Sequence, residues 1–435
     1  MNTASLHVLI ITTRSPLRPV AGLPLLVRNV LAATSIGVGK VTILSDLAIT
    51  ELAPALQQIQ SRNPKLSLNL SSAPQWVDHC KGTLNGDRIL LLHTDGAVTP
   101  AWIKALLQDP CGPDEILSYS CGANDHDHML LDVAHLSHVL VTLAQSNSIT
   151  TEGLYRQIAS IAHPRATNKF NHAAYYGSIV TATDVAKVEK QLFRRLTKKS
   201  DGYISRYFNR PLSTSLSRQL APFNISPMQL TWVTAFFGIA MFLAFIGGQS
   251  YSLILGCILF QVASVADGMD GEIARVKYLA STRGAAWDTS VDMATNLLFI
   301  IGLMSALHLQ YGPNYLHLGI YLVAVSSAAI TLLSLLVYFG PGGGSFDVVG
   351  QALVNRLAAY PRTQTIITVV EKFFKRDAYA FIFALLGIIG LAYVIPWMLA
   401  VGVSLWLLAV IINTPYILKA RPADILPEHI KNLRP

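Results

Sequence analysis

The stretch that decides the fold of the C-terminal half is ADGMDGEIARVKYLASTRGAAWDTSVD, which runs from Ala266 to Asp292. Two apolar runs flank it, LILGCILFQVASV before and MATNLLFIIGLMSAL after. Between them lie four aspartates: Asp267, Asp270, Asp288 and Asp292. Ionisable side chains in an apolar span are costly unless they face a cavity, a partner or a metal. The stretch therefore predicts a functional site inside a membrane domain.

The spacing of the aspartates predicts a metal site. Asp267 and Asp270 are three residues apart, and Asp288 and Asp292 are four apart, so each pair lies on one face of a helix. The basic turn between the pairs predicts a helical hairpin in which both faces meet. Neighbouring carboxylates repel one another, and a hard divalent cation removes that repulsion. Such a centre suits displacement at phosphorus.

Small residues and one arginine accompany the aspartates. Gly271, Ala274 and Gly284 leave room for the close approach of a helix or a ligand. Arg275 would be a fixed cation for a diphosphate. Packing, or a positive charge flanking a span, accounts equally well for any one of these residues, but not for the whole set.

The composition is that of a membrane protein with a polar N-terminal part. Of 435 residues, 52% are hydrophobic and 13% are charged, and the mean hydropathy is +0.43. Long apolar runs predict six spanning helices of about 20 residues, at 229–247, 252–270, 286–308, 315–338, 378–394 and 396–416. Every second connection is basic, which predicts that both termini and the aspartates face the cytoplasm of an inner-membrane protein.

The net charge of +8 does not indicate nucleic-acid binding. The basic residues are concentrated at 187–218, directly before the first apolar run, where contacts with anionic lipid headgroups are expected. In this segment, Arg206, Arg210 and Arg218 are candidates for binding the phosphate of an acceptor. Contact with lipid headgroups explains them equally well.

The N-terminal part predicts a doubly wound α/β domain, because β-rich runs alternate with helical stretches. Strands are expected at 6–13, 40–46, 66–71 and 87–95, with helices such as 24–37 and 101–108 between them. A ligand of such a sheet would lie at the carboxyl ends of the strands. The polar segment Asn124–His128 is more typical of a solvated loop than of a metal site.

The order of strand, loop and later strand ending in Asp95 resembles the sugar-phosphate nucleotidyltransferase family. Asp95 matches the metal-binding aspartate of that family. The loop after the first strand has no glycine, however, and no lysine precedes Pro24, so we expect a degenerate domain. Arg14, Arg18 and Asp95 remain candidates for binding a nucleotide or sugar phosphate. Alternatively, Asp95 belongs to a strand-to-helix turn.

The C-terminal part resembles the CDP-alcohol phosphotransferases, also called CDP-alcohol phosphatidyltransferases. Their full signature is matched by Asp267-x2-Asp270-Gly271-x2-Ala274-Arg275-x8-Gly284-x3-Asp288-x3-Asp292. These enzymes transfer the phosphatidyl or a related group of a CDP-linked alcohol to an acceptor hydroxyl and release CMP. The resemblance implies that the four aspartates bind two Mg²⁺ or Mn²⁺ ions. It also implies that Gly271, Ala274, Arg275 and Gly284 line the CDP site, and that Asp292 is the general base.

The flank at 201–210 resembles a subgroup with a fused nucleotidyltransferase domain, including bifunctional inositol-phosphate cytidylyltransferase/di-myo-inositol-phosphate-phosphate synthases. One departure is Met228-Gln229, where members often carry Asn after the proline. We expect an α/β domain at 1–196, a basic interfacial helix at 197–228, a six-span domain at 229–420 and a cytoplasmic tail at 421–435.

The sequence predicts a membrane phosphotransferase, expected as a homodimer in the bilayer, that uses CDP-diacylglycerol and a polar polyol or polyol-phosphate acceptor. A bifunctional enzyme of the inositol-phosphate type is the main alternative, because the N-terminal domain would then supply the CDP-linked substrate. A divalent-cation transporter would explain the aspartates, but not Ala274 and Arg275 at the matching spacing.

Overall fold

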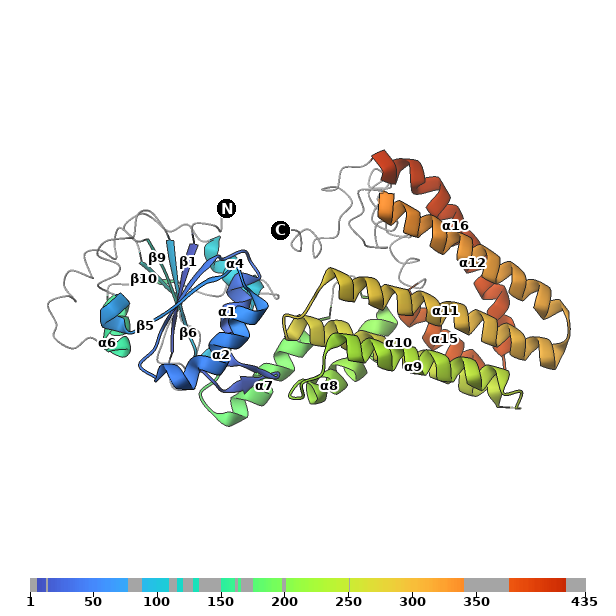
Figure 1. Cartoon of the computed structure of the whole chain (residues 1–435). Coiled ribbons are helices and arrows are strands. Elements are labelled where there is room, and N and C mark those ends of the chain that lie inside the picture. The colour runs from blue at the N-terminus through green and yellow to red at the C-terminus, as the bar shows by residue number, and fades with distance from the viewer. Residues whose placement is uncertain are drawn as a thin grey trace. The chain divides into compact units, whose positions relative to one another are not determined.

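The computed structural model describes eleven segments of the chain: 6–12, 15–76, 88–108, 116–119, 128–132, 150–160, 163–165, 175–197, 201–249, 251–339 and 375–419. The chain forms two compact units (Figure 1). The first contains residues 1–195 with 221–224 and 276–278. The second contains residues 196–220, 225–275 and 279–435.

The first unit is built on a seven-stranded mixed sheet in the order β10-β8-β9-β6-β1-β4-β5. Neighbouring strands from β5 to β6 are parallel, whereas β9 runs antiparallel to both β6 and β8. The strands are β1 (Leu6–Ile11), β4 (Lys40–Leu44), β5 (Ser67–Ser71), β6 (Arg88–His93), β8 (Ile116–Tyr119), β9 (His128–Asp132) and β10 (His163–Arg165). The four strands predicted from the sequence are confirmed.

Helices cover both faces of this sheet, because alternate residues of each strand point to opposite sides. Val8 and Ile10 belong to a core with α1, α2 and α4, whereas Leu9 and Ile11 pack in a second core with α6. The helices are α1 (Leu25–Thr34), α2 (Ile49–Arg62), α4 (Pro100–Leu107), α6 (Thr151–Ser160) and α7 (Ala182–Arg194). Two short ribbons complete the unit: β2 (Pro19–Val20) with β3 (Leu23–Pro24), and β7 (Gly96–Val98) with β11 (Tyr176–Ser178).

Helix α7 begins at a capping box, in which Thr181 and Asp184 satisfy each other's backbone amides. Hydrogen bonds from the backbone amide and the hydroxyl of Thr181 lower the pKa of Asp184 to about 2. Helix α7 follows β11 and leads to Arg195, where this segment of the first unit ends.

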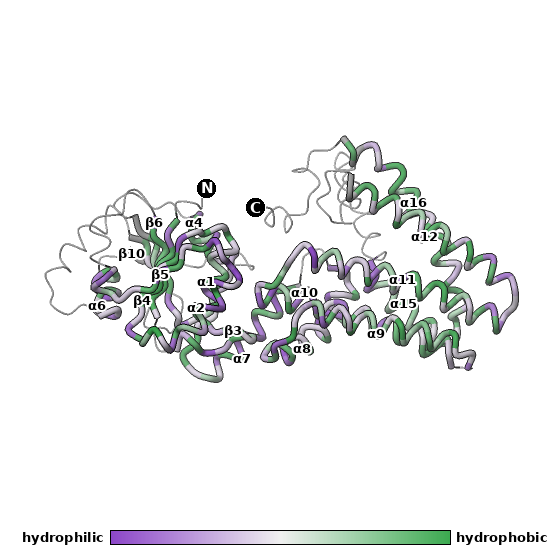
Figure 2. Tube along the Cα trace, viewed as in Figure 1, coloured by the Kyte–Doolittle hydropathy of each residue, from purple (hydrophilic) through white to green (hydrophobic). Residues whose placement is uncertain are grey.

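The second unit is helical and has five helices long and apolar enough to cross a membrane within its described residues. Figure 2 shows hydrophobic residues along most of their length. The elements are η3 (Ser205–Asn209), α8 (Arg210–Leu220), α9 (Pro227–Ile246), α10 (Ser252–Val276), α11 (Thr282–Tyr311), α12 (Asn314–Phe339), α15 (Arg376–Ile388), η4 (Ala392–Val394) and α16 (Ile395–Lys419). The candidate spans are α9, α10, α11, α12 and the stretch Ala392–Pro415.

The count of six spans is not confirmed, because the run expected at 378–394 does not form one long helix. Helix α15 has 13 residues. At about 1.5 Å per residue it extends about 20 Å, less than the hydrocarbon core of about 30 Å. Gly390, with a left-handed φ of 79°, ends the helix, and the Leu391 amide donates back to the Leu386 carbonyl at 2.7 Å.

Aromatic residues fill the core of the helical unit. Phe260 of α10 stacks on Phe299 of α11 with ring centroids 4.1 Å apart, and Phe299 in turn stacks on Phe383 of α15. Phe245 of α9 meets Phe299 edge-on. This core holds the helices that carry the aspartates in a fixed arrangement.

Candidate active site

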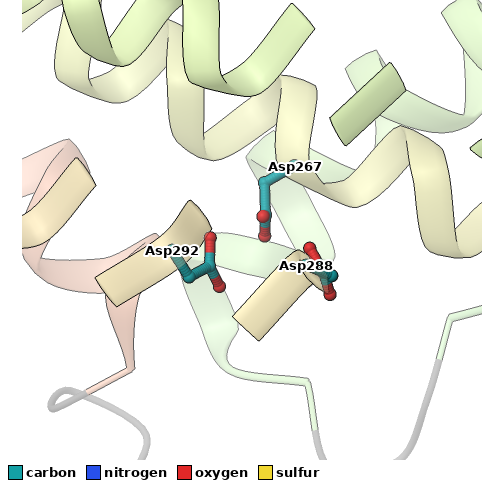
Figure 3. Close-up of side chains that lie close together, drawn as sticks. All are labelled: Asp267, Asp288 and Asp292. Carbon is teal, nitrogen blue, oxygen red and sulfur yellow. The ribbon is translucent and has the colours of Figure 1, made fainter. Parts of the chain in front are cut away.

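Three of the four predicted aspartates converge at the junction of α10 and α11. One carboxylate oxygen each from Asp267, Asp288 and Asp292 lies within 4.8 Å of the others. Asp267 comes from α10, and the other two lie one turn apart on α11. Figure 3 shows the three side chains pointing toward one another. The helical hairpin therefore brings one aspartate of the first pair, Asp267, to both aspartates of the second pair.

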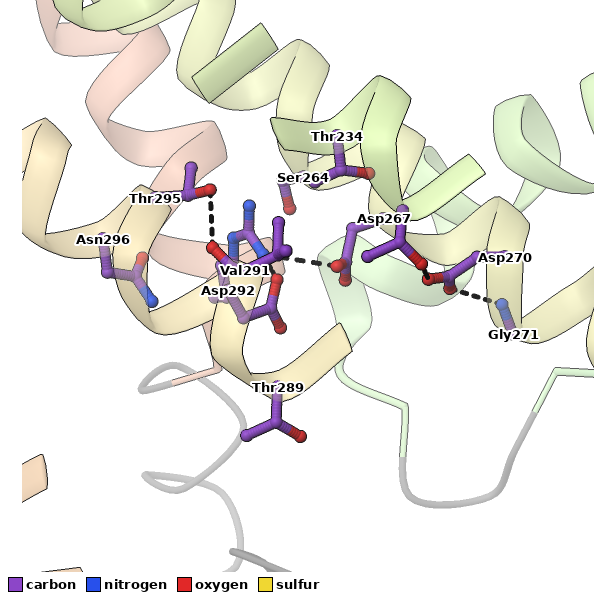
Figure 4. A network of polar contacts seen from close by, with 12 residues as sticks. Thr234, Ser264, Asp267, Asp270, Gly271, Thr289, Val291, Asp292, Thr295 and Asn296 are labelled. Atoms are coloured by element: carbon purple, nitrogen blue, oxygen red, sulfur yellow. Dashed lines mark hydrogen bonds and ion pairs between the residues drawn. The ribbon is translucent and has the colours of Figure 1, made fainter. Parts of the chain in front are cut away.

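Asp270 lies beside this cluster but has different partners. Its carboxylate accepts a hydrogen bond of 2.5 Å from the Thr231 hydroxyl of α9. It also accepts one of 2.5 Å from the Gly271 amide (Figure 4). The charge of Asp267 also acts on it, and Asp270 and Asp288 interact with each other. Asp270 is thus an electrostatic neighbour of the three converging carboxylates, and Thr231 fixes its orientation.

The chemistry of the cluster fits a divalent metal. Hard cations such as Mg²⁺ prefer carboxylate oxygens. Within the described residues, the Oδ1 atoms of Asp267 and Asp288 are buried and accept no hydrogen bond. Buried carboxylate oxygens normally find donors, so these two are suited to a cation.

Arg376, at the start of α15, joins the cluster from a distant part of the chain. Its Nη1 lies 3.4 Å from Asp267 Oδ1 and also forms an ion pair with Asp292 Oδ1. The side chain is only 11% exposed. Sequence reasoning missed this residue and assigned it to a basic connection, because an arginine next to an apolar run is typical of a membrane flank.

Arg275 presents an unused guanidinium group near the carboxylates. Among the described residues, its buried Nε and Nη2 atoms have no hydrogen-bond partner. The group turns back along α10, since a Cβ added at Gly271 would lie 3.1 Å from Arg275 Nη1. Ala274 is half-buried beside it. At the start of α11, the Gly284 amide donates to the Ser281 hydroxyl that caps the helix, at 3.0 Å.

The three arginines proposed from the sequence for an acceptor phosphate differ in their surroundings. Arg206 is exposed and Arg218 is half-buried. Arg210 donates from Nε to Asp201 at 3.1 Å and from Nη1 to Glu272 at 3.0 Å. Burial alone would lower the pKa of Arg210, but Asp201 and Glu272 raise it above its usual value. The Arg210 guanidinium is therefore already paired.

Glu272 is a fifth carboxylate of the same stretch that sequence reasoning overlooked. It is fully buried, and Ser213 and Ser217 of α8 donate to it at 2.6 and 2.7 Å. An acidic residue in an apolar helix is itself a signal of a specific partner. The signal was thus present in the sequence, but the pairing with α8 was not.

A second buried network lies at the start of α15. Asp377 accepts hydrogen bonds from Asn209 at 3.1 Å and from Ser264 at 3.3 Å. Asn209, the last residue of η3, also accepts one from Gln261 at 2.8 Å. The first turn of α15 is therefore fixed to η3 and α10, next to Arg376.

The departure at Met228-Gln229 has a structural role. The Ser226 hydroxyl accepts from the Gln229 amide at 3.3 Å, and the Gln229 side chain accepts from the Ser226 amide at 2.8 Å. This reciprocal pair is a capping box that starts α9. In this departure, Gln229 thus serves to cap the start of α9.

The candidate ligand residues of the first unit are less informative. The Asp95 carbonyl, just after β6, accepts from the Ile179 amide at 2.7 Å, and Arg18 is half-buried. Arg14 lies outside the described residues, as does Asn124–His128 apart from His128 itself. His128 is buried in β9 beside His93 and Trp102.

Comparison with known proteins finds several relatives that share one description. The chain is 36% identical over 137 residues to the "Bifunctional IPC transferase and DIPP synthase" of Aquifex aeolicus, covering 31% of this chain and 30% of that protein. Proteins of the same description from Archaeoglobus fulgidus (34%; 28% and 24% covered) and Thermococcus kodakarensis (35%; 26% and 25% covered) also match. The matched segments span less than a third of each relative.

Two solved structures align with this chain over most of their own length, at 9% sequence identity. They are a putative glucose-1-phosphate thymidylyltransferase from Bacillus anthracis, with a TM-score of 0.29, and 4-diphosphocytidyl-2C-methyl-D-erythritol synthase from Anaerococcus prevotii, with 0.31. They cover 42% and 44% of this chain, and 94% and 99% of their own. Scores this low assign neither fold nor activity.

The helical unit matches a family model. The model for CDP-alcohol phosphatidyltransferase covers residues 224–410, which include α9, α10 and α11 with all four aspartates. Residues 224–410 therefore match the CDP-alcohol phosphatidyltransferase family model, and the converging carboxylates lie inside the matched range.

Proposed function

We propose that this chain is an integral-membrane CDP-alcohol phosphotransferase. It would move a substituted phosphoryl group from a CDP-linked alcohol to an acceptor hydroxyl and release CMP. One observation carries the proposal: the Asp267, Asp288 and Asp292 carboxylates converge within 4.8 Å, and on α10 the buried Nε and Nη2 atoms of Arg275 have no hydrogen-bond partner among the described residues. The family match to residues 224–410 supports it independently.

The proposed roles follow from charge and reach. Asp267, Asp288 and Asp292, with Asp270 beside them, would hold Mg²⁺ or Mn²⁺, as two ions in the full site. A divalent cation supplies charge neutralisation for a diphosphate. Arg275 would hold a phosphate oxygen, with Gly271, Ala274 and Gly284 leaving space for the nucleotide. Asp292 would take the proton of the acceptor hydroxyl. The acceptor oxygen would then bond to phosphorus as the bond between phosphorus and CMP breaks.

The surroundings of the site are also part of the proposal. Basic residues in every second connection support an arrangement with both termini and the aspartates on the cytoplasmic side of an inner membrane, which needs a sixth crossing besides the five candidate spans. We propose a homodimer in the bilayer. Arg206 and Arg218 remain candidates for an acceptor phosphate, whereas Arg210 would first have to leave Asp201 and Glu272.

The identity of the CDP-linked alcohol has two candidates. The resemblance of the signature to the CDP-alcohol phosphotransferases favours CDP-diacylglycerol. The names of the relatives, "Bifunctional IPC transferase and DIPP synthase", favour the alternative in which the alcohol is an inositol. In that case the first unit would supply the CDP-linked substrate, unless it is the degenerate domain that its glycine-free loop indicates. If it is active, the protein will release pyrophosphate from CTP and inositol phosphate.

The full-length protein in detergent with Mg²⁺ tests the proposal. CDP-diacylglycerol or CDP-inositol is offered with glycerol phosphate, inositol phosphate or serine, and CMP and the product mass are measured. We expect Asp292→Asn to abolish CMP release without changing the melting temperature by more than a few degrees. The matched control is Asp184→Asn, which changes a half-buried capping residue of α7 and should retain activity. Undiminished CMP release by Asp292→Asn would refute the assignment, and ion flux into liposomes without CMP would indicate a transporter.

A further inference from the structure

The position of Arg376 raises a question that the proposed chemistry does not answer. Its guanidinium forms ion pairs with Asp267 and Asp292, two of the three residues proposed to hold the metal. One positive charge is therefore already placed between carboxylates that would otherwise repel one another. The arrangement resembles a metal site in which an organic cation takes the metal's place.

Arg376 and a divalent cation cannot both use these oxygens. The Nη1 atom lies 3.4 Å from Asp267 Oδ1, and this is the same oxygen that accepts no hydrogen bond among the described residues. A metal ligated by that oxygen would lie close to the guanidinium, and two cations at short range repel strongly in a buried site. Metal binding thus requires the guanidinium to move.

The helix that carries Arg376 is fixed, so only the side chain is free to move. Asp377 is held by Asn209 and Ser264, which fasten the first turn of α15. The Nε and Nη2 atoms of Arg376 form no hydrogen bond within the described part of the chain. The side chain can therefore change rotamer without breaking other hydrogen bonds, yet it stays beside the site.

We propose that Arg376 is a built-in cation of the carboxylate cluster. In the metal-free protein its guanidinium takes the place between Asp267 and Asp292 that the divalent cation takes when bound, and metal binding displaces it. Arg376 stabilises the empty site and weakens the affinity for metal. This inference rests on the proposed metal site, and it adds a residue that sets the metal affinity.

The test compares metal binding and metal-free stability in the full-length protein in detergent. Binding of Mn²⁺ is followed by loss of the EPR signal of the free ion, and the melting temperature is measured in EDTA. The variants are Arg376→Gln and Arg376→Lys. Arg283→Gln is the control, because Arg283 is an exposed cation of α11, five residues before Asp288, and forms no ion pair within the described part of the chain.

We expect Arg376→Gln to bind Mn²⁺ about tenfold more tightly, the factor expected if the paired form makes up about nine-tenths of the metal-free protein. It should also melt at a lower temperature in EDTA. Arg376→Lys, which cannot bridge two carboxylates in the same way, should fall between it and the wild type. Arg283→Gln should match the wild type in both measurements.

The outcomes separate this inference from the proposed function. Unchanged or weaker Mn²⁺ binding by Arg376→Gln, with normal binding by the wild type, overturns the inference but leaves the metal site standing. If Arg376→Gln does not fold, Arg376→Lys decides by the same criterion. An absence of Mn²⁺ binding to the wild type overturns both the inference and the proposed metal site.

Discussion

Glu272 accepts a hydrogen bond of 2.7 Å from the Ser217 hydroxyl, and this contact ties α10 to α8. The other carboxylate oxygen of Glu272 accepts from Ser213 at 2.6 Å and from Arg210 at 3.0 Å. A charge with no exposed surface is tolerated here because both of its oxygens have donors. The amphipathic helix α8 is thereby fastened to the helix that carries Asp267 and Asp270.

We predict that Glu272→Gln destabilises the protein by about 3 kcal/mol, because it leaves Arg210 in a buried site with one carboxylate instead of two. Ser217→Ala, which removes one donor, should cost about 1.5 kcal/mol. Melting temperatures in detergent, measured side by side, provide the check. A melting temperature of Glu272→Gln equal to that of the wild type would show that α8 is held by other contacts.

Helices α9 and α11 approach closely at Gly238. A Cβ added there would lie 2.9 Å from Thr295 Oγ1 and 3.2 Å from Thr295 Cγ2. We therefore predict that Gly238→Ala lowers stability by about 2 kcal/mol through overpacking. The Thr295 hydroxyl donates to Val291 of its own helix, so removing it costs little. The double variant Gly238→Ala/Thr295→Ala should recover most of the lost melting temperature, and a failure to recover would argue against a local clash.

Thr231 orients Asp270 through a hydrogen bond of 2.5 Å. We predict that Thr231→Val lowers the affinity for Mn²⁺ about tenfold, because partners of the carboxylates around a metal fix their orientation. Stability should change little, since valine keeps the shape of the side chain. The comparison variant is Thr234→Val, one turn along α9, whose hydroxyl bonds to Leu230 of its own helix. Equal Mn²⁺ affinities for both variants would remove Thr231 from the site.

The sequence predicts well whatever depends on local spacing. The convergence of Asp267, Asp288 and Asp292 follows from helical periodicity plus one hairpin turn. The strands of the first unit follow from short β-rich runs. In both cases the pattern is set by residues only a few positions apart along the chain, within one helix or one strand. The structure reproduces these local patterns.

Contacts between segments that are far apart in the sequence cannot be predicted from local spacing. Arg376 is 84 residues from Asp292, and no periodicity links α15 to α11. The apolar run predicts a helix over 378–394, but α15 ends at Ile388, because the left-handed backbone of Gly390 terminates the helix while the apolar run continues. In membrane segments, hydropathy reports burial in lipid or protein but not the point at which the chain turns.

Arg275 provides the sharpest contrast between function and stability. Its buried Nε and Nη2 atoms lack hydrogen-bond partners within the described residues, whereas Arg210 is held by Asp201 and Glu272. Replacing a poorly paired buried charge with an apolar side chain is neutral or stabilising. We therefore predict that Arg275→Met keeps or raises the melting temperature while CMP release falls about a hundredfold.

The matched variant for this prediction is Arg210→Met, which removes the same charge from a paired position. It should lower the melting temperature, because Glu272 then remains buried without its cation. Measuring melting temperature and CMP release for both variants separates the two roles. If Arg275→Met is destabilised as much as Arg210→Met, then Arg275 serves the fold; if only its CMP release falls, its guanidinium is kept free for an anionic substrate group.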